Sequence, residues 1–330
     1  MAIKISGNTV IDDSRNITSS GTMSANAYIG DGSQLTNLPG GGNVLEATAS
    51  GTLSDGSKVI VNADGTVSVV AQTETTGAGV YSASKTVFET GDTYDPQSVF
   101  DPDTGKIVIA YRDNGNSAYG TAVVGTVSGT SISFGTPVVF NTDNTTDFSL
   151  VYDSANQKVV ISYSDRGNGD YGTAIVGTVS GTSISFGSEV VFESTYTYNI
   201  SSTFDSTNNK VVIAYMDVGN SQRGTAIVGT VSGTSISFGS PVVFESGSTQ
   251  HTSSVFDPDT GKVVIAYSDN GNSNYGTAVV GTVSGTSISF GTPVVWSSTG
   301  ATSTAKSVLY DPSSQKVVIV YRDHDGSLYY

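Results

Sequence analysis

The chain contains no cysteine, two histidines and one tryptophan in 330 residues. Without cysteine, neither a disulfide framework nor a thiolate metal site can form. His251 and His324 have no nucleophile motif beside them, which argues against a Ser-His-Asp triad. A His-Glu-x-x-His zinc motif is also absent. We therefore expect no catalytic residue, no metal and no cofactor, and a protein that is not an enzyme.

Positive charge is scarce as well. Lys and Arg number 14 against 29 Asp and Glu, so the formal net charge is -15. Such a polyanion repels phosphates, so neither nucleic acid nor an anionic membrane surface is an expected partner. No apolar run approaches the ~18 residues of a membrane span, and the chain starts without the apolar region of a secretory signal. The abundance of Gly, Ser, Thr, Val and Tyr favours strands and tight turns.

An internal repeat decides the expected fold. The block Gly-Thr-Val-Ser-Gly-Thr-Ser-Ile-Ser-Phe-Gly occurs four times with a period of 52, beginning at Gly125, Gly177, Gly229 and Gly281. A second block, an apolar run that ends in tyrosine, occurs five times, at Tyr111, Tyr163, Tyr215, Tyr267 and Tyr321. Self-similarity at such a period indicates a repeat architecture.

One repeat predicts four short strands. In the fourth copy they cover residues 253–257, 262–269, 276–283 and 287–295, and we name them A to D in chain order. Turn residues separate A from B and C from D. Four antiparallel strands in one repeat are typical of a β-propeller blade. A β-helix repeat is shorter, ankyrin and tetratricopeptide repeats need helical periodicity, and separate sandwiches need ~100 residues each.

Counting the blocks predicts an all-β, five-bladed β-propeller over residues 75–330, made of four-stranded antiparallel blades. Strand B occurs five times and the C–D block four times, so the last blade lacks its strand D. Residues near 80–88 match the strand D pattern of 240–245, so we expect them to complete the last blade and close the ring. For strand C of that blade, residues 327–330 are favoured and 65–70 are the alternative.

The first 74 residues contain no copy of the repeat. Their short apolar patches cannot bury a core large enough to offset chain entropy. Residues 39–42 form a Pro-Gly hinge, and 51–70 predict two hairpins with turns at Asp55-Gly56 and Asp64-Gly65. Such a segment either folds against copies of itself or is a disordered leader.

Several motifs of this segment resemble phage tail-fibre-like virion proteins, especially those of cyanophages and other marine phages. The similar stretches are 4–12, 29–39, 51–56 and 61–68, within about the first 70 residues. The resemblance implies a homotrimeric fibre in the virion, assembled in the host cytoplasm and mounted by its N-terminus on other virion proteins. Residues 1–42 are then an extended virion-mounting and trimerisation segment, and 43–74 a small β collar.

Two aspartates recur in every repeat. Asp101, Asp153, Asp205, Asp257 and Asp311 start the A–B turn, and Asp113, Asp165, Asp217, Asp269 and Asp323 end strand B. A glycosidase needs one pair of carboxylates in unequal environments, whereas five equivalent aspartates fit turn caps. The Asp-Asn-Gly-Asn turns after strand B are predicted as solvated turns, with a structural cation as the alternative.

The repeats differ mainly in their B–C and D–A connections, which lie on one face of an up-and-down blade. The A–B and C–D turns hardly vary and carry Lys106, Lys158, Lys210, Lys262 and Lys316. Diverse residues on a rigid scaffold are typical of binding surfaces, and aromatic side chains with polar neighbours suit sugar rings. The candidate ligand-binding residues are Tyr94, Tyr119, Phe148, Tyr171, Tyr196, Tyr198, Arg223, His251 and Tyr275. Neutral drift in unused loops is the alternative.

Together these patterns predict a virion fibre protein, a tail fibre or receptor-binding adhesin that attaches the phage to host-surface carbohydrate. The alternatives are a structural head or neck fibre, a decoration protein, and a glycan depolymerase. Entry of the chain on the uniform face favours the adhesin, because the diverse face then points outward.

Overall fold

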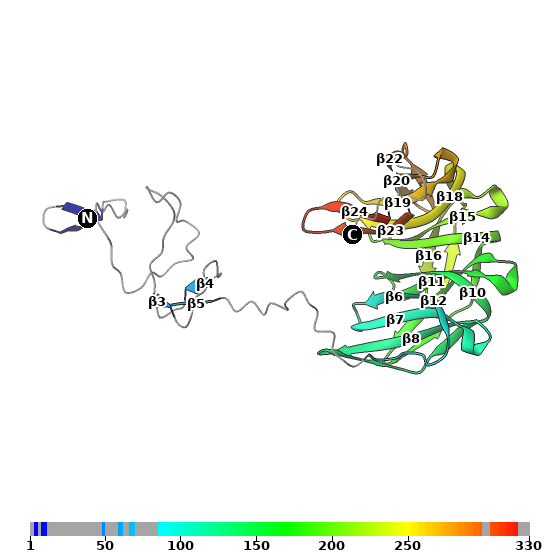
Figure 1. Ribbon diagram of the computed structural model, residues 1–330, viewed down its shortest axis with the longest axis horizontal. Helices are drawn as coiled ribbons and strands as arrows, with labels where there is room; N and C mark the ends of the chain where they lie inside the picture. The colour runs from blue at the N-terminus through cyan, green and yellow to red at the C-terminus, as the bar shows by residue number, and fades with distance from the viewer. Residues whose placement is uncertain are drawn as a thin grey trace. The chain divides into compact units, whose positions relative to one another are not determined.

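The computed structural model describes residues 85–298 and 304–322, together with five short strands in the first 83 residues (Figure 1). The chain divides into two compact units, residues 1–83 and 84–330. The finer boundaries at 42/43 and 74/75 stay predictions.

The first unit contains two small sheets. β1 (Ile3–Ile5) pairs antiparallel with β2 (Asn8–Ile11). β5 (Thr66–Val69) lies between β3 (Thr48–Ala49), its parallel partner, and β4 (Val59–Val61), its antiparallel partner. The predicted hairpin over residues 59–69 is therefore confirmed, and the hairpin around Asp55-Gly56 lies outside the described residues. Because β5 pairs within this unit, residues 65–70 are not strand C of the last repeat, and that alternative is wrong.

The second unit is all-β, as predicted. β6 to β22 form one hydrogen-bonded array of 17 strands whose paired strands are antiparallel, and β23 (Thr304–Asp311) and β24 (Lys316–Arg322) form a separate two-stranded sheet. The strands before the second repeat are β6 (Thr93–Asp101), β7 (Lys106–Asp113), β8 (Tyr119–Ser128) and β9 (Ser131–Phe134). The next are β10 (Val138–Asp153), β11 (Lys158–Asp165), β12 (Tyr171–Ser180) and β13 (Ser183–Phe186). They are followed by β14 (Val190–Asp205), β15 (Lys210–Asp217), β16 (Arg223–Ser232) and β17 (Ser235–Phe238). The array ends with β18 (Val242–Asp257), β19 (Lys262–Asp269), β20 (Tyr275–Ser284), β21 (Ser287–Phe290) and β22 (Val294–Ser297).

Each repeat forms an antiparallel sheet in the predicted order A to D. In the second repeat, the end of β10 is strand A, β11 is B and β12 is C, with Val160 opposite Val176. Strand D is broken into β13 and the start of β14, which pair with successive halves of β12. Figure 1 shows these sheets following one another from β7 and β8 to β20 and β22. Neighbouring sheets approach along their A strands, β6, β10, β14, β18 and β23.

The connections from strand D to the next strand A are not loops, so that part of the prediction is wrong. β10, β14 and β18 are 16-residue strands that begin as strand D of one sheet and end as strand A of the next. A bulge in each lets the backbone bend without leaving the extended conformation. The bulge residue has a left-handed φ of 53° at Asp147, 52° at Asn199 and 54° at His251. Asp and Asn tolerate this region better than most residues.

A closed ring of five four-stranded blades is not what the described residues form. They form an open succession of four four-stranded sheets and the two-stranded sheet of β23 and β24. Residues 86–88 belong to no strand, and no described strand pair joins β6 to β23 or β24. In the other repeats strand D is held by pairing with strand C, and residues 86–88 have no such partner among the described strands. The strand C predicted at 327–330 lies outside the described residues. Phe88 nevertheless contacts the rings of Tyr111 and Phe134, with centroids 5.1 and 5.9 Å apart.

An aromatic side chain from each strand D joins one sheet to the next. Phe192 on β14 lies 5.3 Å from the Tyr215 ring and 5.6 Å from the Phe238 ring, both in the following repeat. The Tyr215 hydroxyl donates to Glu193 at 3.1 Å. The equivalent aromatic residues are Phe140, Phe244 and Trp296, which contact Tyr163, Tyr267 and Tyr321.

One repeat preserves the tyrosine–carboxylate contact with different residues. Asn141 stands where the next two D strands carry Glu193 and Glu245, and Glu189 stands where the three other copies have proline. The Tyr163 hydroxyl donates to Glu189 at 2.6 Å, and the Asn141 amide donates to the same oxygen at 2.8 Å. The loss of glutamate at position 141 is thus compensated by a glutamate at position 189, in the next strand D. The buried Tyr163 hydroxyl therefore keeps a carboxylate acceptor.

The last glycine of the repeated block is required by the next repeat. A Cβ on Gly187 would lie 1.8 Å from the carbonyl oxygen of Thr234, in the C–D turn of the third repeat. Only glycine allows this approach of two backbones. The block therefore stays constant for two reasons, the formation of its strands and the contact that its last glycine makes with the next sheet.

We predict that Phe192→Ala destabilises the second unit by about 3–5 kcal/mol, the range for a phenylalanine lost from a core. Urea unfolding followed by fluorescence measures the change. Val191→Ala is the control, since Val191 is adjacent in sequence but 43% exposed. Similar losses in the two variants would contradict the role of Phe192 in joining the sheets.

Candidate functional site

The repeats have a uniform end and a diverse end. We define the uniform end by the A–B and C–D turns, and the diverse end by the B–C connections and the bulged strands that cross beside them. At the uniform end, the Lys106, Lys210 and Lys262 Nζ atoms each donate to a threonine of strand C at 2.8–2.9 Å. At the diverse end, the Thr197 N–H donates to the Asp170 carbonyl, so a crossing strand is bonded to a B–C connection. The two classes of connection therefore lie at opposite ends, as predicted.

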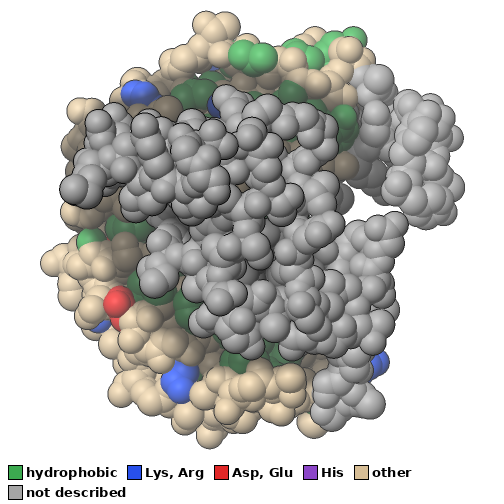
Figure 2. All heavy atoms as spheres, turned by 90° about the vertical axis from the view of Figure 1, so that its left-hand side faces the viewer, with side chains coloured by type: hydrophobic (Ala, Val, Ile, Leu, Met, Phe, Trp, Pro, Cys, Tyr) green, Lys and Arg blue, Asp and Glu red, His purple; other side chains and the backbone are tan. Residues whose placement is uncertain are grey.

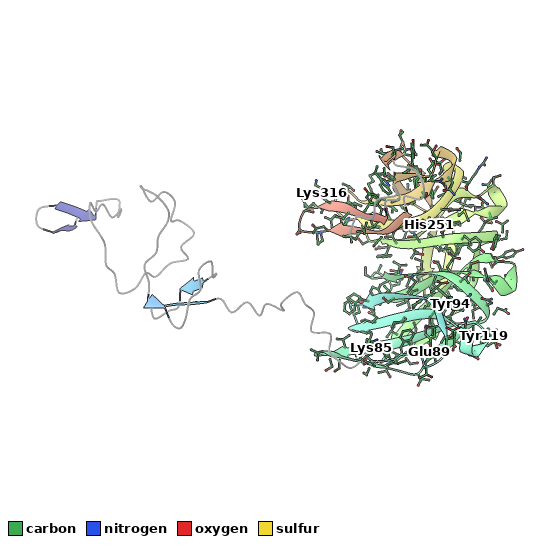
Figure 3. The ribbon with its side chains drawn as sticks, in the orientation of Figure 1. Lys85, Glu89, Tyr94, Tyr119, His251 and Lys316 are labelled. Atoms are coloured by element: carbon green, nitrogen blue, oxygen red, sulfur yellow. The ribbon has the colours of Figure 1, made fainter. Side chains whose placement is uncertain are left out.

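Figure 3 shows both ends of the second unit from the side. In Figure 3, Lys316 lies at the left of the second unit, and Tyr94 and Tyr119 lie toward the right. Lys85, the first described residue of this unit, also lies toward the left. Figure 2 looks onto the left-hand side, where the visible Lys and Arg side chains are scattered singly rather than gathered in a patch.

The aspartates of the uniform end are turn caps, which confirms that interpretation. Asp205 Oδ1 accepts from the backbone N–H groups of Thr207 and Asn208 at 2.9 and 3.0 Å, and Oδ2 accepts from the Asn208 side chain. Asp101, Asp153, Asp257 and Asp311 make the corresponding bonds with side chains three residues later. Hydrogen bonds from Ser313 and Ser314 lower the pKa of Asp311 to about 2. These carboxylates are engaged by their own turns.

A short 3-10 helix follows strand B in each of the four repeats at the diverse end: η1 (Asn114–Asn116), η2 (Arg166–Asn168), η3 (Val218–Asn220) and η4 (Asn270–Asn272). The preceding aspartate caps η1, η3 and η4, whereas Asp165 makes no side-chain cap hydrogen bond to η2. Asp113, Asp217 and Asp269 accept from the backbone N–H three residues later at 3.0–3.1 Å. Burial raises the pKa of Asp269, and the nearby Glu245 carboxylate adds to the effect. Within residues 85–298 and 307–321, no group of three or more His, Asp or Glu side chains could hold a metal ion.

The structure places the predicted ligand-binding residues in different environments. Tyr94 on β6 is 50% exposed, and the Arg112 guanidinium lies 4.5 Å from its ring centroid. Phe148 is buried and packs against Phe140 and Tyr163, so its prediction as a surface residue is wrong. It follows the bulge of a crossing strand, where its side chain enters the contact between sheets.

His251, predicted in a polar connection, is instead the left-handed bulge residue of β18. Tyr119, Arg223 and Tyr275 each begin a C strand and are partly exposed. The Arg223 guanidinium donates to the Asn220 side chain at 3.3 Å.

Three of the predicted tyrosines come together at the diverse end. Tyr171 on β12 lies opposite Tyr196 on β14, and the Tyr196 and Tyr198 rings are 4.3 Å apart at 69°. Arg166 Nη2 donates to the Tyr198 hydroxyl at 3.4 Å, and Arg166 Nε lies 3.3 Å from Asp170 Oδ1. We call these five residues the tyrosine cluster. Arg166 and Asp170 were missed from the sequence, although both depart from the residues that the other repeats carry there.

A line of bulge residues runs beside this cluster. Asp147 Oδ1 accepts from the backbone N–H of Asn199, the bulge residue one repeat later, at 3.1 Å. Burial raises the pKa of Asp147, and the nearby Asp95 carboxylate raises it further. The hydrogen bond joins two crossing strands without a backbone ladder between them.

Comparison with known proteins found no family model that matches the chain and no curated protein that matches it. Across the described residues, no helix is both long and apolar enough to span a membrane.

We predict that Asp147→Asn stabilises the second unit at pH 7 by roughly 0.5–2 kcal/mol, a typical gain from charge optimisation. The raised pKa means that the folded chain holds the proton more tightly, so ionisation costs stability above the folded pKa. Below about pH 4, the ordinary Asp pKa, this cost vanishes and so does the gain.

Thermal unfolding from pH 3 to pH 7 measures the effect. The amide oxygen of an asparagine at position 147 can still accept the Asn199 N–H. Asparagine also fits the left-handed backbone there, because the equivalent bulge residue Asn199 has the same conformation. Asp147→Ala is the control that removes the acceptor, and it should destabilise at both pH values. An equal gain for Asp147→Asn at pH 3 and pH 7 would refute the electrostatic explanation.

Proposed function

We propose that this chain is the attachment protein of a virion fibre and binds host-surface carbohydrate through its diverse end. The observation that carries the proposal is the separation of the two ends. The chain enters the second unit at Lys85, on the side of the uniform turns, and the side chains that break the repeat lie at the other end (Figure 3). A fibre mounted by its N-terminal segment then presents the diverse end outward.

The chemistry of the diverse end favours carbohydrate over a charged polymer. Tyrosines there are partly exposed and have Asn, Asp, Arg and Thr side chains nearby, which suits stacking on sugar rings and bonding to hydroxyls. The net charge of -15 opposes binding to polyanions. Binding, rather than glycan cleavage, also accords with the recurrent aspartates, whose described members other than Asp165 cap turns.

We also propose that the five repeats form a propeller whose first and last sheets meet. The support is a correlation between the A–B turn of one repeat and strand A of the next. The Tyr152 hydroxyl donates to Asp103 of the preceding repeat, and Tyr310 donates likewise to Asp259. Where the turn position is Ala155 or Thr207, the next repeat carries phenylalanine instead of tyrosine, at Phe204 and Phe256.

Closure extends this correlation to the ends of the array. The last turn has Ser313, and the first repeat carries Phe100, the residue expected after a turn without aspartate. Phe100 is 57% exposed, whereas its interior equivalent Phe256 is 8% exposed. On the last sheet, Leu309, Val318 and Val320 are exposed. Bringing these two faces together removes both apolar surfaces from water.

Closure predicts that Phe100→Cys and Ser313→Cys, introduced together, form a disulfide. Because the chain has no cysteine of its own, no other disulfide can form within it. The pair Ala155→Cys and Phe204→Cys is the positive control, since it spans an interior junction. Mass spectrometry under non-reducing conditions distinguishes the products. An intramolecular bond in both pairs supports closure, and a bond only in the control pair, or a bond between chains, contradicts it.

The attachment function predicts carbohydrate binding that depends on the diverse end. The full chain is tested on an array of neutral and acidic oligosaccharides, as wild type and with alanine at tyrosines 94, 119, 171, 196, 198 and 275. We expect the substitutions to abolish binding. Lys158→Ala with Lys316→Ala at the uniform end is the control and should bind as wild type. Binding that survives the tyrosine substitutions would remove the proposal and favour a structural fibre or decoration role.

A further inference from the structure

We infer that the tyrosine cluster, Arg166, Asp170, Tyr171, Tyr196 and Tyr198, is a binding site for one neutral pyranose sugar. The inference rests on the proposed attachment function and names its site and ligand class. It concerns a single junction, between the second and third repeats, and not the diverse end as a whole.

The five side chains form one connected surface. Tyr171 and Tyr196 are register partners on adjacent strands, which brings their side chains to the same face of the sheet. Tyr198 meets Tyr196 edge to face, and Arg166 bonds to the Tyr198 hydroxyl while its Nε faces Asp170. Arg166 is exposed and the other four are partly exposed, so a ligand can reach the cluster.

No other described repeat combines these groups. At the position of Tyr196 the neighbouring repeats have Asn144 and Ser248, and at the position of Tyr198 they have Thr146 and Gln250. Arg166 is replaced by Asn114, Val218 and Asn270, and Asp170 by Ala118, Gln222 and Asn274. The first repeat also has a tyrosine, Tyr94, at the position of Tyr198, but it carries Asp92, Asn114 and Ala118 at the positions of Tyr196, Arg166 and Asp170. Among the described repeats, the combination of all four residues therefore occurs at this junction alone, and each of them contacts another member of the cluster.

The chemistry of the cluster selects the ligand. A pyranose has an apolar C–H face that stacks on an aromatic ring, and hydroxyls around its rim that bond to polar groups. Arg166 supplies N–H donors and Asp170 a carboxylate acceptor at the edge of the tyrosines. Because Asp170 pairs with Arg166 at 3.3 Å, the cluster has no uncompensated positive charge for an acidic sugar. The ligand class is therefore a neutral hexose or its polymer.

The repeats themselves provide replacements that the fold accommodates. In the full chain, Tyr196→Ser with Tyr198→Gln installs the residues of the next repeat, Ser248 and Gln250. Tyr152→Phe is the matched control, because Phe204 and Phe256 occupy the equivalent position and Tyr152 lies beside the uniform end, where it bonds to Asp103. Thermal unfolding verifies that each variant is folded. The probes are an array of neutral glucans, mannans and galactans and of uronic-acid-containing oligosaccharides, followed by titration of the best-bound neutral sugar.

We expect the double variant to bind that neutral sugar about tenfold more weakly or worse, and Tyr152→Phe to bind as wild type. Arg166→Asn should also weaken binding. If the double variant binds as wild type and the variant with alanine at all six tyrosines does not bind, the attachment function stands and this site is overturned. Binding confined to acidic sugars overturns the ligand class. If the wild-type chain binds no sugar on the array, the inference falls together with the proposed function.

Discussion

The structure of the repeated unit depends on one contact, in which an aromatic side chain from one strand D enters the next sheet. Phe140, Phe192 and Phe244 each pack against a buried tyrosine and a phenylalanine of the following repeat. A single four-stranded sheet has two faces to cover, and this contact lets each repeat cover the face of its neighbour. The buried tyrosine hydroxyl then needs an acceptor, and a glutamate near the same aromatic residue supplies it.

This contact explains why the D and A strands are continuous. The aromatic residue lies near the start of a 16-residue strand whose other half belongs to the next sheet. A loop at this point would leave the two sheets free to move apart. A bulge bends the strand while keeping its hydrogen bonds on both sides. The variable residues between strands D and A therefore lie on a strand, where their side chains have defined positions. For a binding surface, such rigidity lowers the entropy lost on association.

Particular elements show how far sequence reasoning reached. The strand order, the turns at Asp205 and its equivalents, and the two opposite ends followed from periodicity and turn chemistry, because these are local properties. Tyr196 and Tyr198 were identified because they lie in the variable D–A connections, and Tyr171 because it shares a B–C position with Tyr119 and Tyr275. Phe148 was misplaced, since variability at a bulge resembles variability in a loop. Arg166 and Asp170 became visible only when the contacts of Tyr198 and the Arg166–Asp170 ion pair were known.

The sequence by itself determined that the chain repeats, that each repeat is an antiparallel sheet, and where its turns fall, because strand alternation and turn residues act over a few neighbouring positions. The tertiary structure decided which sheet each strand D completes and how the crossing strands bend. It also decided which variable side chains meet. Those outcomes depend on contacts between residues about one repeat apart, such as Asp147 with Asn199 and Gly187 with Thr234. Local patterns carry no information on such contacts, because packing geometry alone brings these residues together.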